Sequence, residues 1–273
     1  MPLDPSVATL VRVRISKPPT AAMDFEDIIE ELAKAAKPLL DAPGHRQSAW
    51  GLLQSDHATF MLCSFWDDLA AVSGFRTSAA AETMGHNLAI LGDDHPDAPS
   101  VALTTVDFGG SLDSQAVLRR HTQIRRVYFP SPVSDAARTA VRRLPGLVYR
   151  YGVGISGQDR LGRDTQRAYH RVPAVGWFVA EEMLGERAEE GRVTTKQWDG
   201  KECDELVCVM FWKDGERERK FLEEERLPVT VPGSEPGTAV WVRDMSLMEE
   251  WEGKLEEAGA VGWEDEYVDF CVV

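Results

Sequence analysis

The sequence predicts an α+β protein made of two copies of one β-α-β-β-α-β unit, the element order of ferredoxin-like folds. Apolar residues alternate between the period of a strand and that of a helix in this order across residues 8–108. Much of the same order returns across residues 122–244. The chain of 273 residues, with 43% hydrophobic residues and 8 Trp, 10 Phe and 5 Tyr, is long enough and apolar enough for two such cores.

The first repeat, placed in residues 1–112, has one apolar pattern for each element. A strand-like run ends at Pro18-Pro19, and the helical spacing that follows stops at Pro43-Gly44. A short polar turn then joins two strand-like runs into a hairpin. The expected elements are a strand at 8–16, a helix at 24–40, strands at 48–54 and 59–66, helices at 67–75 and 79–91, and a strand at 101–108.

The second repeat, placed in residues 113–273, carries two insertions and a C-terminal addition. One insertion, residues 151–171, is rich in Arg and Gly, and the other, residues 185–202, separates two strands; either is a lid or a disordered loop. Residues 248–273 predict an amphipathic helix and a short apolar tail. The other expected elements are a strand at 123–129, a helix at 134–144, strands at 175–181 and 206–212, a helix at 215–225 and a closing strand at 238–244.

Local similarity sets the register between the repeats. Residues 49–53 resemble residues 176–180, and residues 60–68 resemble residues 206–214, so four tryptophans take matched positions: Trp50, Trp66, Trp177 and Trp212. In each repeat a phenylalanine follows nine residues after the second tryptophan. Matched tryptophans are typical of a core, but Trp50, Trp66 and Trp177 are also candidates for lining an aromatic ligand cavity.

This pattern resembles the dimeric α+β barrel superfamily, and within it the antibiotic-biosynthesis-monooxygenase-like domains of the kind often found in fungi. The hairpin with Trp50-Gly51, and the strand that ends in Phe65-Trp66-Asp67 before a helix, carry the resemblance. It implies that two ferredoxin-like units pack sheet to sheet as a barrel. Two chains usually supply these units, so the resemblance implies a pseudo-dimer within this chain, present as a monomer or as a homodimer.

Composition excludes several classes of protein. The net charge of −15 argues against general nucleic-acid binding. No segment approaches the roughly 20 apolar residues of a membrane-spanning helix, and the start has no pattern of a secretion signal. Four cysteines without metal-ligand spacing predict neither a disulfide framework nor a zinc site. We expect a cytoplasmic protein with reduced thiols, no bound metal and no contact with membranes.

The acidic total conceals a basic segment in the second repeat. Residues 116–171 hold 12 Arg, no Lys and 3 Asp. Arginine favours paired hydrogen bonds to carboxylate or phosphate groups. The segment therefore either pairs with the acidic residues on both sides of it or binds an anionic ligand.

The first strand of each repeat puts polar side chains on one face. Arg12 and Arg14 share a face opposite the apolar face of residues 8–16, and Arg126 and Tyr128 share a face in the second repeat. We expect the apolar face of the first strand to pack on helices, which directs these arginines to the cavity between the repeats or past a sheet edge. A buried Arg needs an anionic partner, either an internal carboxylate such as Asp107 or a substrate.

Histidines supply the remaining acid–base candidates. A His near neutral pH suits removal of a proton from an acidic C–H or O–H group. His86, next to a glycine within a predicted helix, and His121, at the start of a strand, are the catalytic candidates together with Asp107. The alternative for both histidines is a position without a functional role.

No cofactor motif is recognised. The chain has no P-loop, no hydrolase elbow, no HExxH sequence, and no GxGxxG motif that follows a strand and opens a helix. The leading hypothesis is a cofactor-independent enzyme of secondary metabolism that binds a small hydrophobic, enolisable substrate between the repeats. Proton transfer would lead to cyclisation, isomerisation or rearrangement. The rivals are a cofactor-free monooxygenase of an aromatic polyketide-like substrate, as the resemblance implies, and a non-catalytic ligand-binding or stress-responsive protein.

Overall fold

The computed structural model describes residues 7–15, 22–92, 101–109, 121–143, 174–183, 196–223, 229–230, 239–240 and 247–272. The first repeat contains β1 (Val7–Arg14), α1 (Ala22–Ala35), α2 (Lys37–Leu40), β2 (His45–Leu53), β3 (Thr59–Trp66), α3 (Leu69–Arg76), α4 (Ala79–Leu91) and β4 (Ala102–Asp107). The second contains β5 (Thr122–Pro130), α5 (Asp135–Arg143), β6 (Ala174–Met183), β7 (Lys196–Trp198), β8 (Lys201–Phe211), α7 (Gly215–Glu223), β9 (Val229–Thr230), β10 (Ala239–Val240), α8 (Leu247–Glu257) and β11 (Gly262–Val272).

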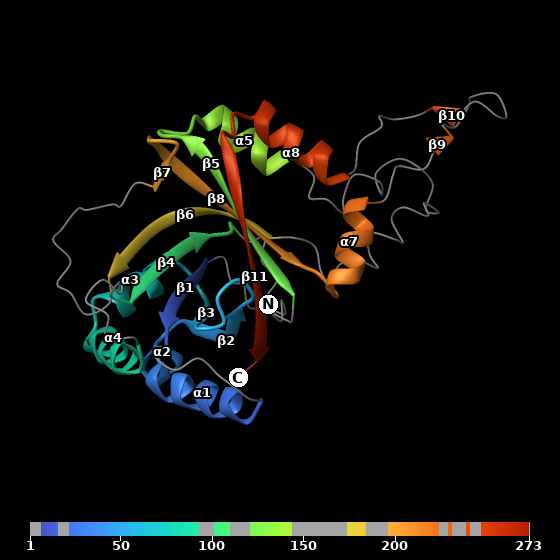
Figure 1. Ribbon diagram of the computed structural model, residues 1–273. Coiled ribbons are helices and arrows are strands. Elements are labelled where there is room, and N and C mark those ends of the chain that lie inside the picture. The colour runs from blue at the N-terminus through green and yellow to red at the C-terminus, as the bar shows by residue number, and fades with distance from the viewer. Residues whose placement is uncertain are drawn as a thin grey trace.

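Eight strands close into a barrel (Figure 1). The hydrogen-bonded order is β5-β11-β2-β3-β1-β4-β6-β8, and β8 pairs with β5 to complete the circle. Each repeat contributes four strands in the ferredoxin-like order, β4-β1-β3-β2 in the first and β11-β5-β8-β6 in the second. The β4–β6 and β2–β11 pairs join the repeats, so both seams are continuous hydrogen-bonded ladders. The predicted tandem ferredoxin-like barrel is confirmed.

The closing strand of the second repeat is β11, so its prediction at residues 238–244 is wrong. Within that range only Ala239–Val240 is described as a strand, and it pairs with the equally short β9. The prediction of an amphipathic helix after residue 248 is confirmed by α8. The prediction of a short apolar tail after this helix is wrong, because Gly262–Val272 forms the strand β11. Glu264 and Glu266 interrupt the alternation of apolar residues that would have indicated a strand.

Part of the second insertion extends the hairpin. Residues 196–202 form β7 and the beginning of β8, joined by a turn at Asp199-Gly200. Both turn residues have positive φ, 52° and 75° respectively, which is the backbone of the tight hairpin turn that an Asp-Gly pair favours. The insertion at residues 151–171 lies outside the described residues.

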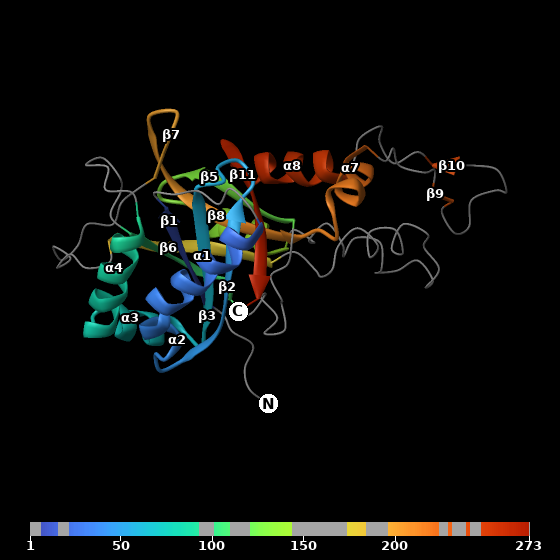
Figure 2. The same ribbon diagram turned by 60° about the horizontal axis from the view of Figure 1, so that its bottom comes forward.

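Three apolar clusters fill the molecule. One lies inside the barrel, and the other two lie between its outer surface and the helices of each repeat. Figures 1 and 2 show α1–α4 on one side of the strands and α5 and α8 on the opposite side. In β1, Val11 and Val13 join the helix-facing cluster, whereas Leu10 joins the interior cluster. The predicted assignment of the two faces of this strand is confirmed.

The apolar part of the barrel interior is nearly filled. Its remaining cavity measures about 10 Å³, which is the space of about one water-sized sphere. The lining side chains come from both repeats: Ala8, Leu10, Cys63, Phe65, Val106, Phe108, Ile124, Val207, Val209 and Phe270. The expectation of a substrate held between the repeats does not fit this part of the barrel, because large side chains occupy the space.

Candidate active site

The matched arginines Arg12 and Arg126 both reach the polar end of the barrel interior. Nη2 of Arg12 lies 2.5 Å from Oε2 of Glu266. Arg126 lies 3.6 Å from Glu205 through Nη1 and 3.7 Å from Glu266 through Nε. The side chains of Arg126 and Glu205 are only 7% and 0% exposed, so the burial of each charge depends on the other. The anionic partners are therefore these internal glutamates.

Asp107 is not among those partners, which corrects one of the two expectations for the arginines. It lies at the end of β4, and its carboxylate accepts a hydrogen bond of 2.8 Å from the backbone N–H of Gly109. This is a local turn contact, and it holds Asp107 to its own loop. Arg14 is exposed at the end of β1.

Tyr128 also points to the polar end of the interior. Its hydroxyl donates to Glu264 at 2.9 Å, and its ring stacks on Trp198 with centroids 4.6 Å apart. Burial, followed by the hydrogen bond to Glu264, raises the pKa of Tyr128. Tyr128 therefore remains a protonated donor that anchors the β7–β8 hairpin over the barrel.

The three candidate tryptophans lie on the helix-facing side of the barrel wall. Trp50 and Trp66 belong to the cluster beneath the first repeat's helices, and Trp177 belongs to that of the second. The indole N–H of Trp66 donates to Thr9 at 2.9 Å. The guanidinium of Arg138 lies 4.5 Å from the ring centre of Trp177. Their positions fit the core alternative, and none of the three joins the interior cluster.

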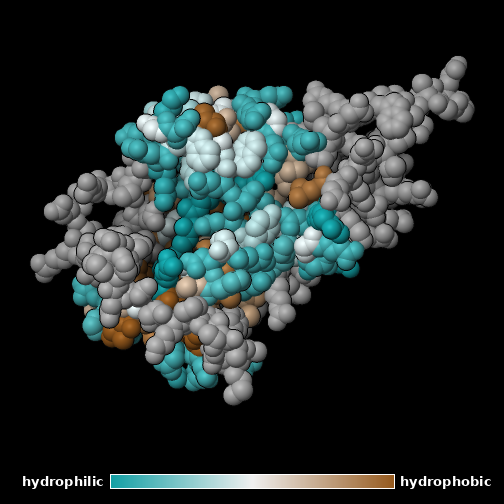
Figure 3. Space-filling view, viewed as in Figure 1, coloured by the Kyte–Doolittle hydropathy of each residue, from teal (hydrophilic) through white to brown (hydrophobic). Residues whose placement is uncertain are grey.

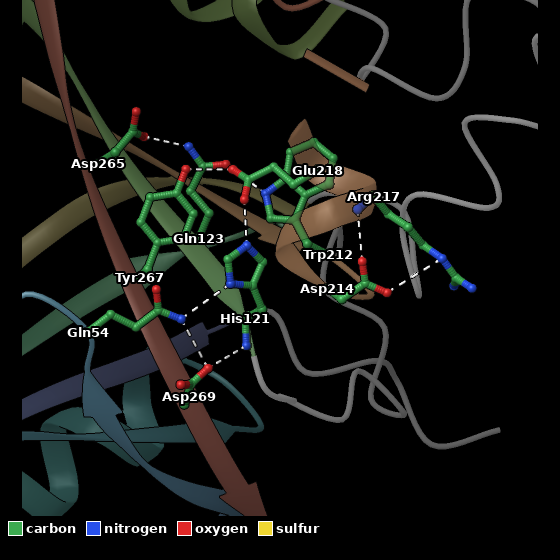
Figure 4. Close-up of polar contacts among 10 residues, drawn as sticks. All are labelled: Gln54, His121, Gln123, Trp212, Asp214, Arg217, Glu218, Asp265, Tyr267 and Asp269. Atoms are coloured by element: carbon green, nitrogen blue, oxygen red, sulfur yellow. Dashed lines mark hydrogen bonds and ion pairs between the residues drawn. The ribbon is translucent and has the colours of Figure 1, made fainter. Parts of the chain in front are cut away.

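The two candidate histidines differ in their surroundings. His86 is exposed on α4. His121 immediately precedes β5 with a φ of 62°, and its side chain is 18% exposed. Its Nε2 lies 2.5 Å from Oε2 of Glu218 on α7, and its ring stacks on Tyr267 with centroids 5.3 Å apart (Figure 4). Gly215 makes room for the ring, since a Cβ there would lie 3.3 Å from Cε1.

Glu218 accepts hydrogen bonds from two sides. Besides the imidazole, the hydroxyl of Tyr267 donates to its Oε1 at 2.5 Å. Burial, followed by this hydrogen bond, raises the pKa of Tyr267, so its phenol stays protonated. Asp214 fixes the start of α7 by accepting from the backbone N–H of Arg217 at 2.8 Å. The carboxylate of Glu218 is therefore held between two donors from the barrel wall.

The other ring nitrogen of His121 faces the first repeat. Nε2 of Gln54, at the end of β2, lies 3.2 Å from Nδ1 of His121 and donates to Asp269 at 3.1 Å. Asp269 accepts a further hydrogen bond of 2.8 Å from the backbone N–H of His121. The site therefore combines strand ends from both repeats with the first turns of α7 (Figure 4).

The strand register shows what occupies the same place in the first repeat. Ala8 lies opposite Phe65, as Thr122 lies opposite Phe211, so His121 matches Val7, one residue earlier. Glu218 and Val72 each follow six residues after the matched tryptophans Trp212 and Trp66.

Tyr267 corresponds to Thr105. Tyr267 lies opposite Gln123 on β5, just as Thr105 lies opposite Thr9 on β1. Gln123 and Thr9 are themselves matched, because each accepts a hydrogen bond from the indole of its repeat's matched tryptophan.

Val7 and Val72 are fully buried in the first repeat's core, with 1% exposure each. The second repeat thus has an imidazole–carboxylate pair at two positions that are apolar and buried in the first repeat. Such a pair contributes less to a core than two valines do, because its polar groups must give up water. Polar groups in place of apolar residues, together with a carboxylate that orients an imidazole, are features of a functional site.

A family model described as antibiotic biosynthesis monooxygenase matches residues 10–86. Residues 10–86 are therefore similar to antibiotic biosynthesis monooxygenase domains. The closed barrel of two ferredoxin-like units is the fold of the dimeric α+β barrel superfamily. The match lies within the first repeat, whose core is apolar at the positions of His121 and Glu218.

Solved structures share the complete tandem fold of the two repeats. An anthrone oxidase-like protein is 12% identical with a TM-score of 0.53, and the match covers 99% of this chain and 94% of that one. A proposed monooxygenase from Lactobacillus acidophilus is 8% identical with a TM-score of 0.50 and 99% coverage of both chains. A proposed monooxygenase from Fusobacterium nucleatum is 7% identical with a TM-score of 0.50, covering 99% of this chain and 94% of its own. No curated protein matches by sequence.

Among the residues that the structure describes, no three His, Cys, Asp or Glu side chains are grouped so that they could hold a metal ion. No helix in the described ranges is both long and apolar enough to cross a membrane. On the face drawn in Figure 3, hydrophilic side chains cover the middle of the barrel and hydrophobic ones are scattered.

Sequence reasoning found His121 but missed its partners. Glu218 lies in a helix whose many charged residues indicate a solvent-exposed face, and Tyr267 lies in the segment predicted as a short apolar tail. The alignment of the two repeats contained the missing signal for Glu218, because its counterpart Val72 occupies a buried helix position. A carboxylate at a position that is apolar in the other repeat indicates either a partner or a function.

Proposed function

We propose that this protein is an enzyme that removes a proton from a small hydrophobic, enolisable substrate, with His121 as the base. The observation that carries the proposal is the His121–Glu218 pair at two positions whose counterparts, Val7 and Val72, belong to the buried apolar cluster of the first repeat. In the proposed mechanism, the carboxylate of Glu218 holds the proton of the neutral His121 ring on Nε2, so Nδ1 accepts the substrate's proton. The proposal needs no cofactor, because the proton moves between substrate and side chains.

The proposed chemistry begins with an acidic C–H beside a carbonyl, or with the O–H of its enol. The proton moves to Nδ1, and the electron pair of the broken bond remains on the substrate as an enolate. Glu218, 2.5 Å from Nε2, stabilises the imidazolium that forms. Return of the proton to another atom gives isomerisation, and attack of the enolate on a second carbonyl gives cyclisation.

Oxygenation is the second candidate function. The family match at residues 10–86 and the likeness to an anthrone oxidase-like protein favour it. It shares the first step, after which the enolate would reduce dioxygen. One oxygen atom would bond to the carbon that lost the proton and the other would leave as water. The nearly filled interior, with its cavity of about 10 Å³, is instead the observation that favours a non-catalytic binding protein.

Anthrone is a suitable probe, because its methylene protons exchange through the enolate. We expect the wild-type protein to speed the exchange of these protons for deuterium in D₂O without air. Consumption of anthrone only when oxygen is admitted would support the monooxygenase. Conversion of anthrone to another product without oxygen would support the cyclase or isomerase. Binding without faster exchange would contradict both enzymes and favour the binding protein.

A further inference from the structure

We propose that Gln54, which belongs to the first repeat, is a catalytic residue of the site in the second. It would hold the substrate oxygen that loses its proton to His121. This inference rests on the proposed function and deepens it. It places an oxygen atom of the substrate, such as that of a phenol or an enol, between the two side chains.

The geometry of the two nitrogens carries the inference. Nε2 of Gln54 and Nδ1 of His121 are 3.2 Å apart, one a donor and the other an acceptor. A single oxygen atom at hydrogen-bond distance from both fits this spacing.

Gln54 is held in place by the second repeat. Its backbone N–H donates to the carbonyl of Tyr267 at 2.9 Å, which extends the β2–β11 ladder by one residue. Its side-chain amide donates to Asp269 at 3.1 Å. The amide has two N–H groups, so one can bind Asp269 while the other faces Nδ1 of His121.

The proposed step transfers one proton and no electrons. The substrate O–H bond breaks, the proton binds Nδ1, and the electron pair stays on the oxygen. The amide of Gln54, which faces Nδ1 before the reaction, then donates its hydrogen bond to this oxyanion. The new positive charge on the ring faces Glu218 on α7. The other charged and titratable groups around the ring are Tyr267, Asp269 and the substrate anion.

In the free protein, Gln54 should occupy the lone pair of Nδ1. We would record the ring ¹⁵N resonances of His121 in the wild type, in Gln54→Leu and in a control, Gln197→Leu. Gln197 is exposed on β7. The Nδ1 resonance should move in Gln54→Leu and stay in the control. An unchanged resonance in Gln54→Leu would overturn the contact and with it the inference.

The second measurement uses 4-nitrophenol as the probe, because its anion absorbs visible light. Gln54→Leu should lower the ratio of 4-nitrophenolate to 4-nitrophenol in the bound probe about 10- to 100-fold, because the anion, a charged group, loses one hydrogen bond. His121→Asn should abolish the protein's effect on that ratio. Loss in His121→Asn with no change in Gln54→Leu would overturn the role of Gln54 alone. No change in either variant would overturn the proposed function as well as this inference.

Discussion

Glu218 is a carboxylate with an 8% exposed side chain and two donors, His121 and Tyr267. A buried carboxylate is costly unless hydrogen bonds and an opposite charge replace its hydration. In the proposed reaction, His121 becomes an imidazolium beside this carboxylate. The pair would then stabilise the charged ring more than the neutral one, which is the condition for catalysis.

Glu218→Gln should keep the shape of the site and remove its charge. We expect anthrone proton exchange to fall about 10²- to 10⁴-fold, because the imidazolium loses its counter-ion and the neutral ring loses the preference for a proton on Nε2. Glu82→Gln, on the exposed side of α4, is the matched control and should exchange at the wild-type rate. Equal rates in both variants would contradict the role of Glu218.

His45 provides a pH-dependent test of the fold. Burial lowers the pKa of His45, which lies 2.8 Å from Ser48 and edge-on to Trp66. The unfolded chain therefore binds a proton at His45 at higher pH than the folded protein does. The contribution of neutral His45 to the free energy of unfolding is lost as pH falls below the pKa of an unfolded His, about 6.5. Denaturant unfolding between pH 7.5 and 5.5 should show a smaller loss in His45→Gln than in the wild type. Equal losses would contradict the assignment.

At the scale of elements, β11 connects the parts of the site. Its inward residues Val268 and Phe270 belong to the barrel interior, while Tyr267 and Asp269 on its other face contact Glu218 and His121. Arg125 of β5 forms paired hydrogen bonds of 2.7 Å to Asp265 and a 2.5 Å contact with Glu252 of α8. The strand β11 and the preceding helix α8 are therefore both anchored to Arg125 of β5.

Two glycine-to-alanine changes test the packing of these elements. A Cβ on Gly51 of β2 would lie 2.4 Å from Cγ1 of Val268, whereas one on Gly253 of α8 meets nothing within 4 Å. Gly51→Ala should lower the free energy of unfolding by about 1–3 kcal/mol through overpacking. Gly253→Ala should raise it by about 0.5–1 kcal/mol, because alanine is the better helix former. Urea titrations that gave the two changes the same sign would contradict the packing of β2 against β11.

The elements differ in how far the sequence predicts them. Strands and helices with regular apolar spacing were predicted in the first repeat and through β8, because each buries one apolar face. The strand β11 was missed because Arg12 and Arg126 neutralise its inward-facing Glu266, and that pairing is set by residues far along the chain. His121 was predicted as a candidate, but its contacts with Gln54 and Glu218 depend on barrel closure.

At the scale of the whole molecule, the β2–β11 seam between the repeats positions the site. The β2–β11 seam brings Gln54 to His121, and the interior ion pair of Arg12 with Glu266 crosses the same boundary. Arg12 and Arg126 are matched positions, so both repeats direct an arginine to the same end of the interior. Barrel closure and site assembly are therefore linked through one strand.

The buried pair of Arg126 and Glu205 should be strongly coupled. Arg126→Met leaves the fully buried Glu205 without this partner and should lower the free energy of unfolding by about 3–5 kcal/mol. Adding Glu205→Met should recover much of that loss, since no lone charge remains. Urea unfolding of both single variants and the double variant gives the coupling energy. Losses that simply add would contradict the pairing.

The most direct test compares two histidine variants in anthrone proton exchange. His121→Asn keeps a residue that tolerates the φ of 62° and removes the base, whereas His86→Asn changes an exposed histidine of the first repeat. Circular dichroism should show both variants folded. We predict a loss of about 10²-fold or more in His121→Asn and the wild-type rate in His86→Asn. A wild-type rate in His121→Asn would contradict the assignment of the active site to the second repeat.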